Sequence, residues 1–285
     1  MSDMQTAYKV AALAVRQRFA EQHPAALEVL DKIHKDEVAA YPGSFDQVEE
    51  VLHCLGVPAT VNPNPKALKA KIAFVNCSNN YDKTLIEQIG NYVEKGNWLV
   101  TSDWALHYVL EKAFPNTVRW TNKSTSEDVI SVEPYLNSLW SDIVVLGADP
   151  QWWLWGSYPI EVLNPKTVQV EAASHDLLVQ HNAPVVAVRF PWGKGHVYHV
   201  ISHFWAKRSQ TPTLRHQGPC TDFLSSGMKL SDEGVEKVLH QAGIKPDTLN
   251  FAQIQSAATS TELVAQLCVR AVKHQKSVAG SCSII

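Results

Sequence analysis

Residues 71–115 constrain the fold of this chain more than any other stretch. They read KIAFVNCSNNYDKTLIEQIGNYVEKGNWLVTSDWALHYVLEKAFP. Apolar runs at residues 72–75 and 98–100 each give way to small polar residues, and a helix-period segment that stops at Gly96 separates them. This order of strand, helix, strand, polar turn and helix is typical of an open parallel sheet. In such sheets, ligands and chemistry collect where strands end and helices begin.

The length of 285 residues suits one large α/β domain with extra helices at its ends. Apolar residues make up 45% and charged residues 19%, which allows a substantial core and argues against wholesale disorder. A net charge of −3 gives no reason to expect nucleic acid as a partner. We find neither a bilayer-spanning apolar run nor a signal peptide, so we expect a cytoplasmic protein.

The pattern predicts four segments along the chain. Residues 1–36 read as two helices divided at His23-Pro24. Residues 37–206 hold the alternating strands and helices, and residues 207–220 form a basic, Pro-containing linker. Residues 221–285 are expected to form a helical extension with a flexible tail.

Local patterns add three expectations. Ser44 is a plausible N-cap for a helix that runs to Leu55. Residues 151–156 read QWWLWG, which we interpret as an aromatic loop that walls a pocket, docks a partner, or folds onto the sheet as core. Residues 184–190 and 196–202 are β-rich, and the PWGKG between them predicts a hairpin.

Three stretches together resemble a known family in their order and spacing. They are FDQVEEVLHCLGVPATV at residues 45–61, YVEKGNWLVTSDWA at residues 92–105 and PVVAVRFPWGKGHVYHVISHFW at residues 184–205. This combination is similar to the class I glutamine amidotransferase-like superfamily. The second stretch resembles that family's step into its nucleophile turn, and the third resembles its closing hairpin, whose last strand ends at a histidine. The resemblance implies a flavodoxin-like α/β fold: a mostly parallel sheet with helices on both faces, plus a β-hairpin and terminal helices.

The chain departs from the family where its chemistry lies. The family's enzymes place a cysteine, or in peptidase-like branches a serine, in the turn where residues 101–104 read TSDW. Its amidotransferases follow their histidine with proline and glutamate, whereas His203 is followed by Phe-Trp. The cysteine, its flanking glycines and the glutamate are all missing. We therefore expect a protein that has lost amidotransferase activity.

Two side chains could act as nucleophile with His203 as general base. Ser102 lies in the strand-to-helix turn, where backbone N–H groups could form an oxyanion site. The alternative is that Ser102 or Asp103 caps the helix over residues 104–114. Cys77 follows the strand at residues 72–75 and could be a nucleophile if its pKa were lowered, but a semi-buried loop thiol is the favoured interpretation.

Neither a metal nor a cofactor is expected. His196, His199 and His203 fall in one extended segment, in which residues four apart lie about 13 Å from each other. That separation is too large for a shared ion.

The leading hypothesis is a non-catalytic binding or assembly module that recognises a protein partner or a small ligand at the strand carboxyl ends. Self-association is a further expectation, and membrane contact would require lipidation of Cys282 in the terminal CSII, which we take as a chance match. The alternative is a hydrolase of amide or ester bonds that uses Ser102 or Cys77 with His203. The expected ligand-binding residues are Asn76, Asn79, Asp103, Trp104, Trp153 and Trp155.

Overall fold

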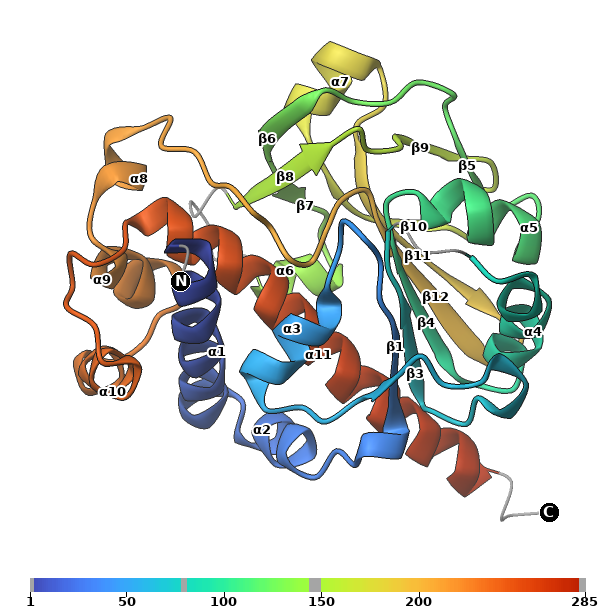
Figure 1. The fold of residues 1–285 in the computed structure, drawn as a ribbon, viewed down its shortest axis with the longest axis horizontal. Coiled ribbons are helices and arrows are strands. Elements are labelled where there is room, and N and C mark those ends of the chain that lie inside the picture. Colours follow the sequence, from blue (N-terminus) through green and yellow to red (C-terminus); the bar gives the residue numbers. More distant parts are fainter. Residues whose placement is uncertain (1–2, 78–80, 144–149, 282–285) are drawn as a thin grey trace.

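The computed structural model describes residues 3–77, 81–143 and 150–281, with backbone alone at residues 142 and 276–281. Its centre is an eight-stranded sheet in the order β2-β1-β3-β4-β12-β11-β10-β7 (Figure 1). The first five strands in that order run parallel, and each of the last three runs antiparallel to its neighbour. The strands of this sheet are β1 (Val38–Tyr41), β2 (Thr60–Val61), β3 (Ile72–Val75), β4 (Trp98–Ser102), β7 (Glu133–Pro134), β10 (Gln169–Ala173), β11 (Val185–Trp192) and β12 (Gly195–Val200).

Helices cover both faces of the sheet. The helices α1 (Asp3–Gln22), α3 (Val48–Leu55) and α11 (Phe251–Ser281) lie on one face, and α4 (Lys83–Glu94) and α5 (Glu111–Ala113) lie on the other (Figure 1). A mostly parallel sheet between two helical layers is a flavodoxin-like α/β fold, which confirms the fold class expected from the sequence. None of the helices within the described ranges combines the length and the apolar character needed to cross a bilayer.

Shorter elements complete the structure. Two small antiparallel pairs, β5 with β9 and β6 with β8, lie apart from the main sheet. These strands are β5 (Val118–Trp120), β6 (Glu127–Ser131), β8 (Gln151–Trp155) and β9 (Ile160–Val162). The remaining α-helices are α2 (Pro24–Asp31), α6 (Leu139–Ile143), α7 (His175–His181), α8 (Leu214–Gln217), α9 (Cys220–Asp222) and α10 (Asp232–Ala242). Two π-helical turns, η3 (Leu106–Leu110) and η4 (Phe223–Gly227), and two 3-10 turns, η1 (Lys35–Glu37) and η2 (Pro65–Ala67), connect them.

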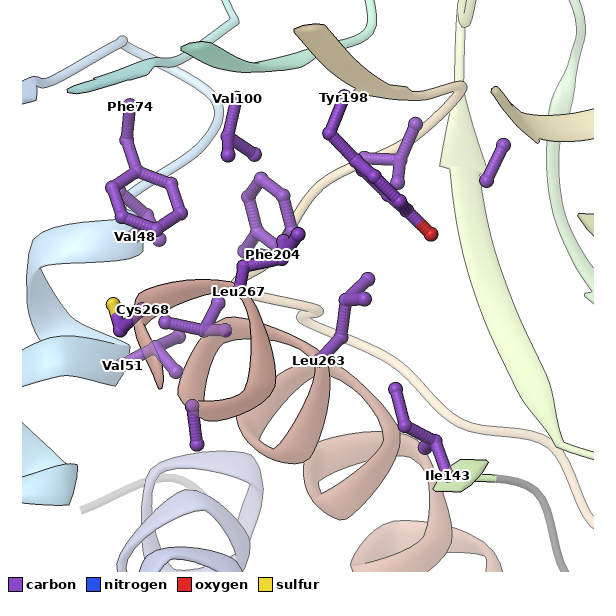
Figure 2. Packing of buried hydrophobic residues seen from close by; sticks show 14 of the residues in the cluster. Val48, Val51, Phe74, Val100, Ile143, Tyr198, Phe204, Leu263, Leu267 and Cys268 are labelled. Carbon is purple, nitrogen blue, oxygen red and sulfur yellow. The ribbon is translucent and has the colours of Figure 1, made fainter. Parts of the chain in front are cut away.

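The long helix α11 forms much of the core on its side of the sheet. Leu263 and Leu267 point from this helix toward the side of the sheet side chains Phe74 and Val100, and Cys268 lies on the side of α3 (Figure 2). All five side chains are buried, so their removal from water is the main term that holds the helix in place. The terminal helices therefore share one continuous core with the sheet.

The order of the strands reverses between β1 and β3. The chain leaves β1 through α3 and reaches β2 on one side, whereas it leaves β3 through α4 and reaches β4 on the other. The loops after β1 and β3 therefore diverge at the carboxyl edge of the sheet. Open α/β sheets bind their ligands at such a reversal point.

The expectation that Ser44 caps a helix is wrong. Helix α3 begins at Val48 with Gln47 as its N-cap, and that cap has no side-chain hydrogen bond. The residues before it are held in a loop, because the amides of Phe45 and Asp46 both donate to the Cys77 carbonyl. Because of these tertiary hydrogen bonds, the helix begins about one turn later in the chain than expected.

The expectation of an aromatic loop is also wrong. Residues Gln151–Trp155 form β8, which pairs antiparallel with β6. Trp152 and Trp153 are both buried although they alternate in direction, because Trp152 packs near Trp140 and Trp153 packs near His203. The alternative that these side chains join the core is correct for this pair, whereas Trp155 stays 44% exposed.

The predicted hairpin is confirmed, and its turn gives a first test of the packing. A Cβ atom on Gly195 would lie 2.1 Å from the Asn97 carbonyl oxygen and 2.3 Å from that of Val93. Because both neighbours are backbone atoms, we expect Gly195→Ala to lower the free energy of unfolding by about 2 to 3 kcal/mol. Gly56→Ala is the control, since its Cβ would meet nothing within 4 Å and only its φ of +72° opposes the change. That control should lose about 1 kcal/mol in the same urea denaturation, and equal losses would contradict the clash.

Candidate functional site

Polar side chains from three parallel strands meet at the carboxyl edge of the sheet. Strand β4 pairs parallel with both β3 and β12, and Val200 lies opposite Ser102. The segments that follow β4 and β12 therefore lie at the same edge of the sheet. Cys77 follows β3, Asp103 follows β4 directly, and His203 follows β12 by three residues.

Cys77, Asp103 and His203 form a compact cluster. The Cys77 Sγ atom lies 3.6 Å from Asp103 Oδ2, to which the thiol donates a hydrogen bond. His203 Nε2 lies 3.2 Å from the same oxygen, although out of line for a hydrogen bond. All three potential ligand atoms lie within 4.8 Å of one another, and no side chain of the three is more than 1% exposed. The carboxylate therefore stands in contact with both the thiol and the imidazole.

Asp103 adopts a backbone conformation that side chains rarely take. Its φ is +47°, and its amide donates to the Val200 carbonyl at 2.9 Å. Its Oδ1 atom accepts from the Tyr158 amide at 2.8 Å, which orients the carboxylate and leaves Oδ2 toward the cluster. Such backbone strain persists only where surrounding contacts determine it. The interpretation that Ser102 or Asp103 caps the next helix is wrong, because the helical turn after Asp103 has no side-chain cap.

The Ser102 hydroxyl is engaged away from His203. It donates to Asp46 Oδ2 at 2.6 Å and accepts from the Cys77 amide at 3.1 Å. The side chain is fully buried. Among the described residues, its hydrogen bonds thus tie two loops together and none of them reaches the imidazole.

Asp46 is a site residue that is not among those expected from the sequence. Its Oδ1 atom accepts from the amides of Gln47, Phe204 and Trp205 at 2.9, 2.9 and 3.1 Å. With the Ser102 hydroxyl on Oδ2, this buried carboxylate joins the loop after β1 to the segment that carries His203. The one sequence signal was an acid in a loop directly after a strand.

Burial controls the protonation of this cluster. It raises the pKa of the Cys77 thiol well above its ordinary value, and the nearby Asp103 carboxylate raises it further. Burial also raises the pKa of Asp103 and of Asp46. Burial alone would lower the pKa of His203, but its contact with Asp103 outweighs burial and the pKa is raised. The thiol is therefore held neutral, which opposes its use as a nucleophile.

The protection of Cys77 is directly measurable. We expect iodoacetamide to leave Cys77 unmodified in the native protein, because the thiol is both inaccessible and protonated. Cys54, which is half-buried, should react sooner, and the fully buried Cys268 should stay protected. Peptide mapping by mass spectrometry reports each site. Modification of Cys77 as fast as Cys54 would contradict the closed site.

The buried His199 on β12 makes the stability of the protein depend on pH. Burial lowers its pKa to about 3, and its contact with Thr101 at 2.8 Å offsets little of this. The unfolded chain takes up this proton below about pH 6.5, so the native state loses stability as the pH falls from there toward 3. We expect His199→Gln to remove about 2 to 3 kcal/mol of the stability loss between about pH 7 and pH 4.5. Urea denaturation of both proteins at each pH measures this, and an equal acid loss in the variant would refute it.

Of the expected ligand-binding residues, some lie inside the protein. Asn76 is buried and donates to the Asp46 carbonyl at 3.3 Å. Trp153 is buried with its ring 5.4 Å from that of His203. Asn79 lies outside the described residues, as does Cys282 of the tail.

Two tryptophans lie nearer the surface. Trp104 is partly buried and its Nε1 donates to the Gly156 carbonyl at 2.9 Å. Trp155 lies edge-on to Phe45, with ring centroids 5.2 Å apart. The aromatic wall expected from the sequence is therefore reduced to these two rings and Phe45.

An open pocket lies at the carboxyl ends of β1, β2 and β3, where the strand order reverses. Its volume is about 600 Å³. It is lined by Tyr41, Pro42, Gly43, Ser44, Asn62, Pro63, Asn64, Pro65, Tyr81, Asp82 and Leu85. Sequence reasoning placed the ligand crevice at the strand carboxyl ends but missed these residues, because three separate loops contribute them.

A second pocket of about 830 Å³ lies over the antiparallel part of the sheet. Residues of β9, β10 and the start of β11 line it, together with Lys123 and Leu136. Its place away from the parallel strand ends sets it apart from the usual ligand site of such a sheet.

Comparisons with known proteins do not assign this chain to a family. Neither a family model nor a curated protein matches this chain. A GMP synthase-like protein from Thermoplasma acidophilum superposes with a TM-score of 0.47 at 12% identity, over 85% of this chain and 99% of that one. A ThuA-like protein from Bacteroides uniformis gives 0.43 at 9% identity, over 74% and 90%. A β-galactosidase from Rahnella sp. R3 gives 0.40 at 16% identity, over 60% of this chain and 29% of that enzyme.

Proposed function

We propose that this protein is a non-catalytic binding module that holds a small, uncharged, hydroxyl-rich ligand in the pocket at the ends of β1, β2 and β3. The observation that carries the proposal is the place of this open pocket at the point where the strand order reverses. Its volume of about 600 Å³ falls within the range of small-molecule sites.

The lining favours a neutral ligand. Its polar side chains are two tyrosines, two asparagines, one serine and one aspartate, and no lysine or arginine of the described ranges lines it. Amide and hydroxyl groups both donate and accept, which suits the hydroxyls of a sugar or polyol. An anion is disfavoured because Asp82 lines the pocket and already caps α4 by accepting from the Thr84 amide at 2.8 Å.

A hydrolase that uses Ser102 or Cys77 is the weaker candidate. The buried state of both side chains and of His203 denies a substrate direct access. The raised pKa of Cys77 and the two hydrogen bonds of Ser102 oppose activation of either one. Ester or amide turnover that is lost in Cys77→Ala would reverse this preference.

The test is ligand binding observed by saturation-transfer NMR. Neutral mono- and disaccharides and polyols serve as probes, with inorganic phosphate and a nucleotide as anionic comparisons. We expect at least one neutral probe to bind. Binding should be lost in Ser44→Trp, because Ser44 is an exposed lining residue and an indole at this position would fill the pocket. Lys123→Trp, which fills the second pocket instead, should retain it.

Three outcomes would overturn the proposal. The first is that none of the neutral probes binds, and the second is that the anions bind better than the neutral probes. The third is that binding survives in Ser44→Trp but is lost in Lys123→Trp. The last outcome would move the binding site to the second pocket.

A further inference from the structure

The chemistry of the Cys77, Asp103 and His203 cluster differs from that of the open pocket. A thiol, a carboxylate and an imidazole are the three side-chain types that bind Zn²⁺ most often. They come from segments that follow three different strands, yet their potential ligand atoms all lie within 4.8 Å of one another.

Two of the three separations agree to within about 0.1 Å with the edges of a zinc tetrahedron, and the third, from Cys77 Sγ to His203 Nε2, is at most 4.8 Å. Bonds of roughly 2.0 to 2.3 Å from zinc to its ligands imply ligand-to-ligand separations of about 3.3 to 3.8 Å. The separation from Cys77 Sγ to Asp103 Oδ2 is 3.6 Å, and that from His203 Nε2 to the same oxygen is 3.2 Å. Small side-chain rotations would therefore suffice to admit an ion.

Neighbouring groups leave Asp103 Oδ2 and His203 Nε2 available to bind a metal ion. Asp103 Oδ1 is occupied by the Tyr158 amide, so Oδ2 is the oxygen that faces the cluster. Neither ring nitrogen of His203 has a hydrogen-bond partner among the described residues, although the side chain is only 1% exposed. Its Nε2 atom has the 3.2 Å contact with Asp103 Oδ2 but no aligned hydrogen bond, and a metal bond to Nε2 would supply the missing partner.

We propose that Cys77 Sγ, Asp103 Oδ2 and His203 Nε2 are three ligands of a zinc site, with the fourth position left to a water molecule. Zinc binding forms the bonds to sulfur, oxygen and nitrogen, and it breaks the S–H bond of Cys77, whose proton passes to the solvent. One thiolate, one carboxylate and one neutral imidazole balance the two charges of the ion. A net neutral centre is what a buried position requires.

The donor set selects among metals. A thiolate and an imidazole favour zinc over magnesium or calcium, which prefer oxygen ligands alone. The carboxylate is oriented by a hydrogen bond from outside the cluster, as the ligands of zinc sites usually are. The site does not depend on the ligand proposed for the open pocket.

The test uses the full chain and cobalt as a spectroscopic substitute for zinc. After treatment with a chelator, the protein is titrated with Co²⁺. We expect one equivalent to produce a thiolate-to-cobalt charge-transfer band and the visible bands of a tetrahedral centre, and Zn²⁺ to displace them. A featureless spectrum, together with no zinc retained after dialysis, would overturn the proposal.

Variants assign the ligands. Cys77→Ala should abolish the charge-transfer band, and His203→Gln should weaken Zn²⁺ binding about tenfold or more. Cys268→Ala is the matched control, since Cys268 is an equally buried thiol on α11 and should leave the spectrum unchanged. If Cys77→Ala does not fold by circular dichroism, Cys77→Ser keeps an oxygen ligand and should lose only the sulfur band. Persistence of that band in either Cys77 variant would refute the assignment.

Discussion

Asp46→Ala is expected to lower the free energy of unfolding by about 3 to 5 kcal/mol, because it removes the shared acceptor of four hydrogen bonds inside the protein. The substitution leaves the buried Phe204 amide and the Ser102 hydroxyl without their partner. It also frees the loop after β1 from the segment that carries His203. Urea denaturation at neutral pH measures the loss.

Two further variants identify the cause of this loss of stability. Asp46→Asn keeps an oxygen for the amides and should lose about 1 kcal/mol, since only the bond from Ser102 must rearrange. Asp82→Ala removes an exposed carboxylate that caps α4 through the Thr84 amide, and it should also lose about 1 kcal/mol. A loss in Asp46→Ala no larger than that of Asp82→Ala would contradict the central role of the buried carboxylate.

Breaking the buried ion pair between the two terminal helices should have an effect of similar size. Arg18 on α1 donates to both oxygens of Glu262 on α11, at 2.8 and 2.7 Å. Both side chains are buried. We expect Arg18→Ala to lower the free energy of unfolding by about 3 to 5 kcal/mol, because it leaves the Glu262 carboxylate buried without its main partner.

The double substitution Arg18→Met with Glu262→Leu separates the charge from the packing. It removes both charges while it keeps apolar volume, so it should recover most of the loss. Lys32→Ala serves as the control, since its pair with Glu28 is exposed and its loss should stay below about 1 kcal/mol. Urea denaturation of all three proteins measures these losses. If the double variant is no more stable than Arg18→Ala, the lost packing rather than the charge explains the effect.

Part of the site was predictable from residue patterns. An apolar run that ends in small polar residues placed Cys77 and Asp103 at strand ends, and the closing hairpin placed His203 beyond its last strand. What the patterns could not supply was which functional groups meet. The hydrolase alternative required Ser102 beside His203, yet the Ser102 hydroxyl bonds to Asp46 and to the Cys77 amide. The partner of each polar group depends on side-chain directions at the strand ends, which one residue more or less would reverse.

The same limit applies to the aromatic segment. The segment QWWLWG at residues 151–156 was interpreted as an aromatic loop. In the structure, residues 151–155 form a strand that is covered on both faces, so Trp152 and Trp153 are both buried. Burial on both faces erases the alternation from which a strand is recognised.

From sequence alone, the periodicities of 2 and 3.6 residues determined the α/β class, the division of the first two helices at Pro24 and the hairpin formed by β11 and β12. These features depend on neighbours within a few residues, so local patterns suffice to predict them. Only the tertiary structure decided that Cys77, Asp103 and His203 form one cluster and that three loops enclose the open pocket. Both depend on the order and register of strands far apart in the chain, which local periodicity does not encode.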